Sequence, residues 1–101
     1  MPKPKEGVLP DFQVFETDEF LERLGKLSSK DADFIRRKLD SHAYPQIKRE
    51  PFWGSNIKKL KGYDPDTWRY RIGNFRIFYV VDQADRTIYI LTVENRKDAY
   101  K

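Results

Sequence analysis

Hydrophobic and polar positions along the chain follow two different periods. In the segment PDFQVFET, which starts at Pro10, apolar residues alternate with polar ones, and Phe12 and Val14 fall on one face. Apolar residues then recur at helical spacing over residues 20–27, and again over residues 32–43. The pattern therefore predicts a strand followed by two short helices.

Capping residues support both helices. Thr17 precedes the first helix, and Ser28 with Asp31 resembles a capping box before the second. The pair Tyr44-Pro45 is expected to end the second helix, because the residue before a proline avoids the helical conformation.

The second half of the chain predicts strands. Gly73-Asn74 is a two-residue turn signal between two apolar stretches, and the stretch after it is apolar on both faces, so its strand should be central in the sheet. The four predicted strands are IKKLKG (57–62), WRYRI (68–72), FRIFYVV (75–81) and RTIYILTV (86–93).

The element order is β-α-α-β-β-β-β. We predict an α+β fold in which the N-terminal helical hairpin covers one face of a small antiparallel sheet, leaving the other face for solvent or a ligand. The length of 101 residues suits a single domain over 1–101, with residues 1–10 as a flexible arm.

Composition narrows the chemistry. The chain has no cysteine and one histidine, which excludes thiolate chemistry and a histidine-rich metal site. No apolar run approaches the length of a membrane span, so we expect a soluble, cytoplasmic protein that does not bind membranes. The net charge is +4, and residues 48–76 hold eight basic against three acidic side chains. A local basic excess is typical of a polyanion-binding surface, although a solvated lysine face fits the charge equally well.

Three arginines stand within the predicted hairpin. In WRYRI, Arg69 and Arg71 alternate with apolar residues and should point away from the helices, and Arg76 on the return strand can join them. Three guanidinium groups on one surface repel each other unless an anion lies among them, and guanidinium binds phosphate bidentately. This pattern predicts a phosphate site. The alternative is that carboxylates such as Asp64 and Asp66 neutralise the arginines.

Sequence motifs in the same region resemble a known family. The segments KKLKG (58–62), WRYRIGNFRIFYVVD (68–82) and RTIYILTVENRKDAYK (86–101) are together similar to the toxins of the RelE/ParE superfamily. The resemblance implies a small antiparallel sheet with an N-terminal helical hairpin. It also implies a type II toxin. RelE-type members cleave mRNA in the ribosomal A site through attack of the ribose 2′-OH on the adjacent phosphate, whereas ParE-type members poison DNA gyrase.

The resemblance assigns roles to individual residues of the RelE-type site. It makes Arg69 and Arg71 basic site residues, Arg76 a stabiliser of the transition-state phosphate, Arg96 an aid to departure of the 5′-oxygen, and Tyr100 a base-stacking side chain. The RNA-binding candidates are Lys58, Lys59 and Lys61, which could instead solvate an edge strand. No metal and no cofactor are expected.

One departure from the family pattern concerns the general base. Arg71 stands where some RelE enzymes have a lysine that is proposed as the base, and an arginine stays protonated. The base could be water, a ribosomal group or Tyr100. The alternatives to a ribosome-dependent endoribonuclease are a gyrase inhibitor and a catalytically weak toxin that acts mainly within an antitoxin complex. The expected partners are a cognate antitoxin, the ribosome with mRNA, and operator DNA through the antitoxin alone.

Overall fold

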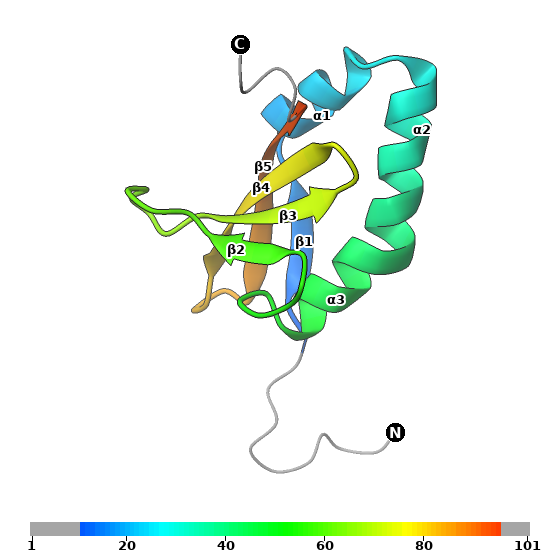
Figure 1. The fold of residues 1–101 in the computed structure, drawn as a ribbon. Helices are drawn as coiled ribbons and strands as arrows, with labels where there is room; N and C mark the ends of the chain where they lie inside the picture. Colours follow the sequence, from blue (N-terminus) through cyan, green and yellow to red (C-terminus); the bar gives the residue numbers. More distant parts are fainter. Residues whose placement is uncertain (1–10, 96–101) are drawn as a thin grey trace.

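The structure, a computed structural model, describes residues 11–95 (Figure 1). The predicted N-terminal arm, 1–10, lies outside the described residues, as do Arg96 and Tyr100. The prediction that the whole chain is one domain stays a prediction for that reason. Within the described range no helix is both long and apolar enough to cross a membrane.

One five-stranded sheet forms the centre of the structure, in the order β1-β5-β4-β3-β2. β1 runs parallel to β5, and every other neighbouring pair is antiparallel. β4 lies in the middle of the sheet, which confirms the prediction from its two apolar faces. The strands are β1 (Gln13–Glu16), β2 (Ile57–Lys59), β3 (Trp68–Ile72), β4 (Phe75–Asp82) and β5 (Thr87–Asn95).

Both predicted helix starts are confirmed. The Thr17 side chain accepts a hydrogen bond from the backbone of Phe20 at the start of α1 (Asp18–Gly25). The Ser28 side chain accepts one from the backbone of Asp31 at the start of α2 (Ser29–Lys38). Each cap supplies a partner for one backbone N–H that the first helical turn leaves unpaired.

The predicted helix end at Tyr44-Pro45 is wrong. A π-helical turn over Leu39–Ala43 follows α2 and leads directly into α3 (Tyr44–Arg49). Pro45 falls in the first turn of α3, where its missing N–H costs little. Just before Pro45, the Tyr44 N–H donates a π-helical hydrogen bond to the Leu39 carbonyl in place of the regular α-helical bond. Burial of Ile47, which is 1% exposed, stabilises the extra helix.

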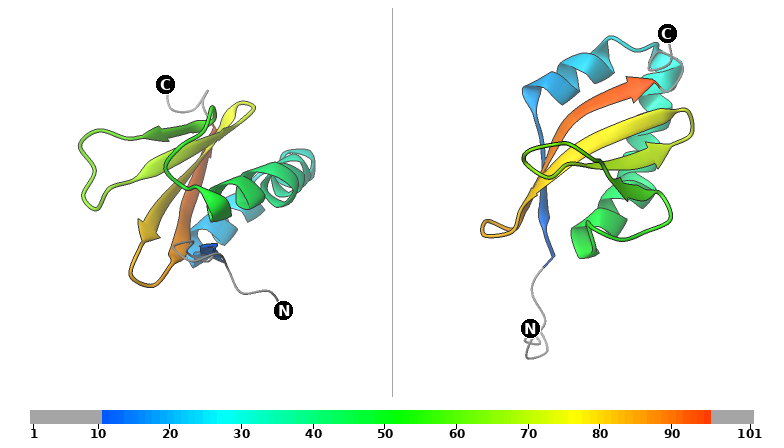
Figure 2. Two further views of the ribbon diagram at one scale, coloured as in Figure 1. Left: turned by 90° about the horizontal axis from the view of Figure 1, so that it is seen from below. Right: turned by 60° about the vertical axis from the view of Figure 1, so that its left-hand side comes forward.

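The main hydrophobic core lies between the helices and one face of the sheet (Figure 2). Tyr79 of β4 is at its centre with 0% exposure, and its hydroxyl donates to the carbonyl of Pro51 at 2.6 Å. The α+β prediction is therefore confirmed. Fully buried side chains from both layers meet there, namely Phe20, Ile35, Leu39, Ile47, Ile77, Ile88 and Ile90.

Candidate functional site

The β3–β4 hairpin places the three predicted arginines on one face of the sheet. Arg71 lies directly opposite Arg76 across the two strands. Arg69 lies between Lys58 of β2 and Phe78 of β4 in the same way. Cross-strand partners point to the same side of a sheet. Since Tyr70 and Ile72 are buried against the helices, the arginines occupy the opposite face, as the alternation predicts.

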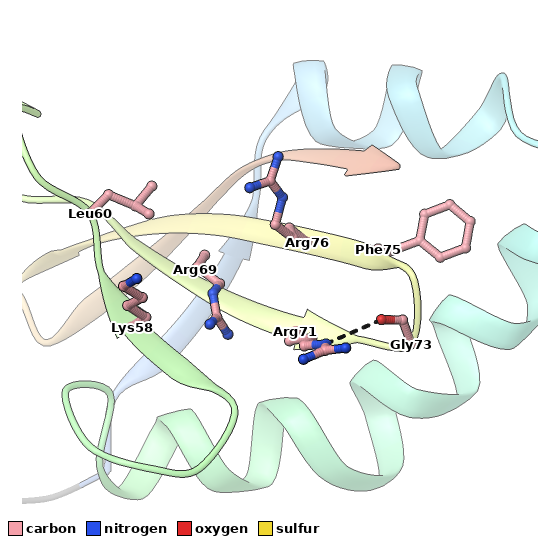
Figure 3. Close-up of a pocket in the computed structure, with 7 residues that line it drawn as sticks. All are labelled: Lys58, Leu60, Arg69, Arg71, Gly73, Phe75 and Arg76. Carbon is pink, nitrogen blue, oxygen red and sulfur yellow. Dashed lines mark hydrogen bonds between the residues drawn. The ribbon is translucent and has the colours of Figure 1, made fainter. Parts of the chain in front are cut away.

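A shallow cavity opens between these side chains, which we call the arginine cleft (Figure 3). Its volume is about 250 Å³, smaller than the usual ~300–1,000 Å³ of a drug-sized ligand pocket. The size and the four cations suit a phosphate group of an extended polymer better than a large free ligand. The lining residues are Lys58, Leu60, Arg69, Arg71, Gly73, Phe75 and Arg76.

Backbone carbonyls hold two of the arginines. Arg69 donates from Nη1 to the carbonyl of Asn56 at 2.8 Å. Arg71 donates from Nε to the carbonyl of Gly73, a long contact of 3.5 Å at the start of the turn (Figure 3). A neutral carbonyl orients a guanidinium without cancelling its charge, so Arg71 keeps the charge that an anion needs.

A carboxylate does contact Arg76, but it is not one of the two that the sequence suggested. Glu94 of β5 lies opposite Arg76 in the sheet, and its Oε2 is 3.4 Å from Arg76 Nη2. The Arg76 guanidinium also lies 5.6 Å from the centre of the Phe78 ring, and its buried Nε has no hydrogen-bond partner among the described residues. Asp66 pairs with Lys59 instead, at 3.3 Å.

The three candidate RNA-binding lysines separate in the structure. Lys58 lines the arginine cleft beside Arg69. Lys59 is the cross-strand partner of Trp68, its Nζ lies 5.9 Å from the Trp68 ring centre, and it therefore belongs to the other face of the sheet. Lys61 is exposed in the turn that follows β2. The structure thus brings Lys58 together with the three arginines and does not bring Lys59 to them.

Sequence reasoning missed Glu94 and Asn56 as neighbours of the arginines. If the pairing that β4 and β5 have next to their turn continued without interruption, Val93 would lie opposite Arg76. An irregularity in the register between Phe78 and Tyr79 shifts the pairing by one residue and brings Glu94 there. Such a bulge has no sequence signal strong enough to predict, because it depends on how the two strands twist together.

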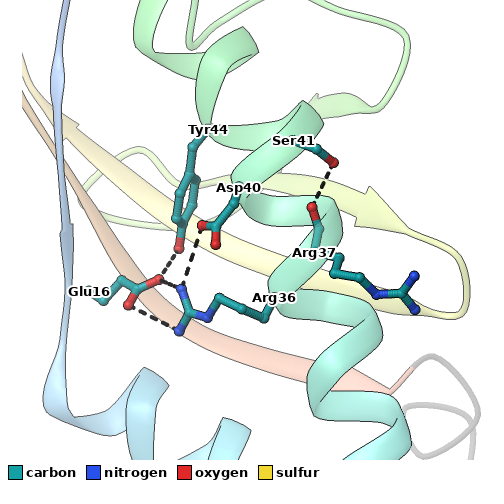
Figure 4. A network of polar contacts seen from close by, with 6 residues as sticks. All are labelled: Glu16, Arg36, Arg37, Asp40, Ser41 and Tyr44. Atoms are coloured by element: carbon teal, nitrogen blue, oxygen red, sulfur yellow. Dashed lines mark hydrogen bonds and ion pairs between the residues drawn. The ribbon is translucent and has the colours of Figure 1, made fainter.

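A second polar cluster lies on the helical side of the sheet (Figure 4). The Glu16 carboxylate of β1 accepts hydrogen bonds from Arg36 of α2 at 2.6 and 3.2 Å, and one from the Tyr44 hydroxyl at 2.5 Å. Burial alone would raise the pKa of Glu16, but the bonds from Arg36 and Tyr44 outweigh it and hold that pKa below its ordinary value. The same burial and the bond to Glu16 raise the pKa of Tyr44. This cluster ties β1 to the helices.

No group of three or more histidine, aspartate or glutamate side chains gathers in a way that could hold a metal ion anywhere in residues 11–95. His42, the one histidine of the chain, is exposed late in the helical segment, and its Nδ1 lies 2.6 Å from Ser41 Oγ.

Comparison with known families now identifies the class of protein. Residues 16–100 match the family model described as ParE toxin of type II toxin-antitoxin system, parDE. The chain therefore belongs to this toxin family, and the predicted membership of the RelE/ParE superfamily is confirmed.

Individual relatives agree with this assignment. A putative toxin RelE1 from Methanocaldococcus jannaschii is 47% identical over 55 residues, which are 54% of this chain and 57% of that protein. The chain thus spans little more than half the length of the curated relative it matches.

Solved structures show the same fold. The RelBE2 toxin–antitoxin complex from Mycobacterium tuberculosis matches with a TM-score of 0.65 and 25% identity, covering 85% of this chain and 99% of that one. The RelB–RelE complex from Methanococcus jannaschii matches with a TM-score of 0.59 and 25% identity, covering 84% of this chain and 93% of that one. A YoeB/ParE toxin from Agrobacterium tumefaciens matches with a TM-score of 0.64 and 19% identity, covering 83% of this chain and 98% of that one. At this identity the match supports the fold alone.

Proposed function

We propose that the protein is a ribosome-dependent mRNA endoribonuclease of a type II toxin–antitoxin system. In the proposed reaction the ribose 2′-oxygen attacks the adjacent phosphorus and the bond from phosphorus to the 5′-oxygen breaks. The 2′-OH gives its proton to a base, the 5′-oxygen receives one, and the products are a 2′,3′-cyclic phosphate and a 5′-OH end. The observation that carries the proposal is the arginine cleft, where three arginines and Lys58 line one hollow.

Arg71 and Arg76 face each other across β3 and β4 and can contact the same phosphate from two sides. Guanidinium groups offer paired N–H donors, which match two phosphate oxygens and the extra charge of the pentacoordinate transition state. Arg69, held by the Asn56 carbonyl, is the third cation of this arrangement. Arg96 and Tyr100 complete the proposed site as an aid to departure of the 5′-oxygen and a base-stacking side chain.

Arg71 is not assigned as the general base in this proposal. None of the side chains that line the cleft is a carboxylate or an imidazole, and an arginine is a poor general base. Tyr100, water or a ribosomal group remain the candidates. A group supplied by the ribosome would also explain why cleavage should need it.

The partners belong to the same proposal. The structures of the relatives named above include complexes of RelE with RelB, so we propose a cognate antitoxin for this chain as well. Ribosome-bound mRNA is the proposed substrate, operator DNA is contacted through the antitoxin alone, and the cytoplasm is the proposed location.

The test is a cleavage assay with purified protein and 70S ribosomes that carry a defined mRNA and an empty A site, with cut ends mapped by primer extension. Arg76→Ala should lower the cleavage rate by about 10²-fold or more, the usual effect of removing one donor to a developing oxyanion. Arg23→Ala is the matched control, because Arg23 is an exposed arginine of α1 and its loss changes the net charge equally. Equal cleavage by the wild type and a folded Arg76→Ala variant would refute the assigned site.

A second function, inhibition of DNA gyrase, is favoured by the description of the matching family model, which names ParE and parDE. The same protein would then leave ribosome-bound mRNA intact and inhibit supercoiling by purified gyrase. Intact mRNA together with uninhibited gyrase would favour the third reading, a catalytically weak toxin that acts mainly in an antitoxin complex.

A further inference from the structure

A second hollow lies beside the arginine cleft, between β3 and the helical segment that runs from α2 into α3. We call it the helix groove. Arg71 and Gly73 line both hollows, so the two meet at the end of β3, where Figure 3 shows Arg71 next to the Gly73 carbonyl. Its lining residues include Phe34, Lys38, His42, Arg71, Ile72 and Gly73.

The groove has an opening beside β3 because β2 is short. β2 pairs with β3 only from Trp68 to Tyr70, and beyond Tyr70 no described strand continues on that side. The helical wall of the groove is formed here by α2 and the π-helical turn, which contribute Phe34, Lys38 and His42. A ligand that leaves the arginine cleft at Arg71 therefore meets the groove next.

The charges on the groove favour an anion. Lys38, His42 and Arg71 are exposed, and none of the lining residues is acidic. Within residues 11–95 no carboxylate forms an ion pair with Lys38 or Arg71, although Arg76 and Lys59 each have one. The contact of His42 Nδ1 with Ser41 Oγ, at 2.6 Å, leaves Nε2 as the nitrogen that can face a ligand.

An aromatic wall accompanies these charges. Phe34 of α2 is half-buried and lies so close to the β3–β4 turn that a Cβ on Gly73 would be 3.3 Å from its Cε2 atom. Ile72 is 4% exposed and closes the floor beside it. A ring face next to two or three cations is the combination that single-stranded nucleic acid uses, since the ring contacts a base and the cations contact phosphate.

We propose that the helix groove is a second RNA subsite, which holds the nucleotide next to the one whose phosphate lies in the arginine cleft. Lys38 and His42 contact its phosphate, Phe34 contacts its base, and Arg71 lies between the two neighbouring phosphates. The proposal rests on the proposed function, because it takes single-stranded RNA as the ligand of the cleft.

The experiment measures binding, so that it does not depend on cleavage. Adenosine 5′-monophosphate and the 2′-O-methylated oligonucleotides ApA and ApApA, which cannot be cut, are titrated into the isotope-labelled protein and followed by NMR chemical shifts at a series of salt concentrations. The variants are Lys38→Ala/His42→Ala and, as the matched control, Lys30→Ala, which removes another exposed lysine of α2.

In the wild type, ApApA should bind more tightly than the mononucleotide and should shift the resonances of Phe34, Lys38 and His42. The double variant should bind ApApA about fivefold to tenfold more weakly. For the double variant, the slope of the logarithm of the binding constant against the logarithm of the salt concentration should be less steep by about 0.7 for each lost phosphate contact. Binding of the mononucleotide should not change, because that ligand fills the cleft alone. Lys30→Ala should behave as the wild type does.

Three results would overturn the subsite. They are equal binding of ApApA by the double variant, no gain in affinity from the added nucleotides, and no RNA-dependent shift in the groove at all. A variant that binds RNA normally but no longer binds an antitoxin peptide would mark the groove as a protein interface instead. Groove binding of RNA with no ribosomal cleavage would keep the subsite and refute only the nuclease proposal.

Discussion

The cluster of Glu16, Arg36 and Tyr44 allows a stability prediction with a defined pH dependence. The Tyr44 hydroxyl donates to a carboxylate whose side chain is 21% exposed, and Tyr44→Phe removes that hydroxyl while it keeps the ring in place. A hydrogen bond to a charged group contributes about 1.5–3 kcal/mol. Because Arg36 still holds the Glu16 carboxylate in the variant, we expect the lower part of this range, about 1.5–2 kcal/mol.

The sign of the pH dependence follows from the lowered pKa of Glu16. A carboxyl group whose pKa is lower in the folded than in the unfolded protein stabilises the fold fully above its unfolded pKa, and this contribution is lost as the pH falls through the folded pKa. Tyr44→Phe removes one of the bonds that lower the pKa of Glu16. The difference in unfolding free energy between the wild type and the variant should therefore be largest near neutral pH and should shrink below about pH 4.5.

Urea denaturation of both proteins across this pH range measures the effect. At neutral pH the loss corresponds to a decrease of about 10 °C in the midpoint of thermal unfolding for a domain of this size. Tyr63→Phe is the control, because Tyr63 is 51% exposed, and its variant should differ from the wild type by less than about 0.5 kcal/mol. A loss of less than about 0.5 kcal/mol for Tyr44→Phe, or a loss that is constant down to acidic pH, would refute the assigned role of the cluster.

Two further substitutions test the hairpin that carries the arginines. Gly73→Ala should destabilise the protein by about 1–2 kcal/mol in urea denaturation, because Gly73 has a φ of +57°. Gly25→Ala is the control and should be neutral or stabilising, because a Cβ added at Gly25 meets no atom within 4 Å. Glu94→Gln should raise the affinity for uncleavable RNA by about twofold to threefold at low salt, because a partly exposed carboxylate competes only weakly with phosphate for Arg76. Weaker binding by Glu94→Gln would show instead that Glu94 positions Arg76.

Sequence reasoning could predict the elements of this fold because each element carries a local signal. The alternation in WRYRI put Arg69 and Arg71 on the face away from the helices, and the Gly73-Asn74 turn brought Arg76 back to them. The two N-caps marked the helix starts. The predicted end of the second helix was wrong, because burial of Ile47 and a π-helical turn outweighed the local effect of Pro45.

The features of the site also fall into those that a local pattern predicts and those that it does not. Local sequence patterns are enough to predict which arginines share a face, because the two-residue period of a strand and a tight turn are properties of neighbouring residues. Three other features become visible only in the folded protein: Glu94 faces Arg76, Lys59 lies away from the cleft, and the cleft continues into a groove lined by Lys38 and His42. These relations depend on strand register and on packing between segments far apart in the chain, which no local pattern encodes.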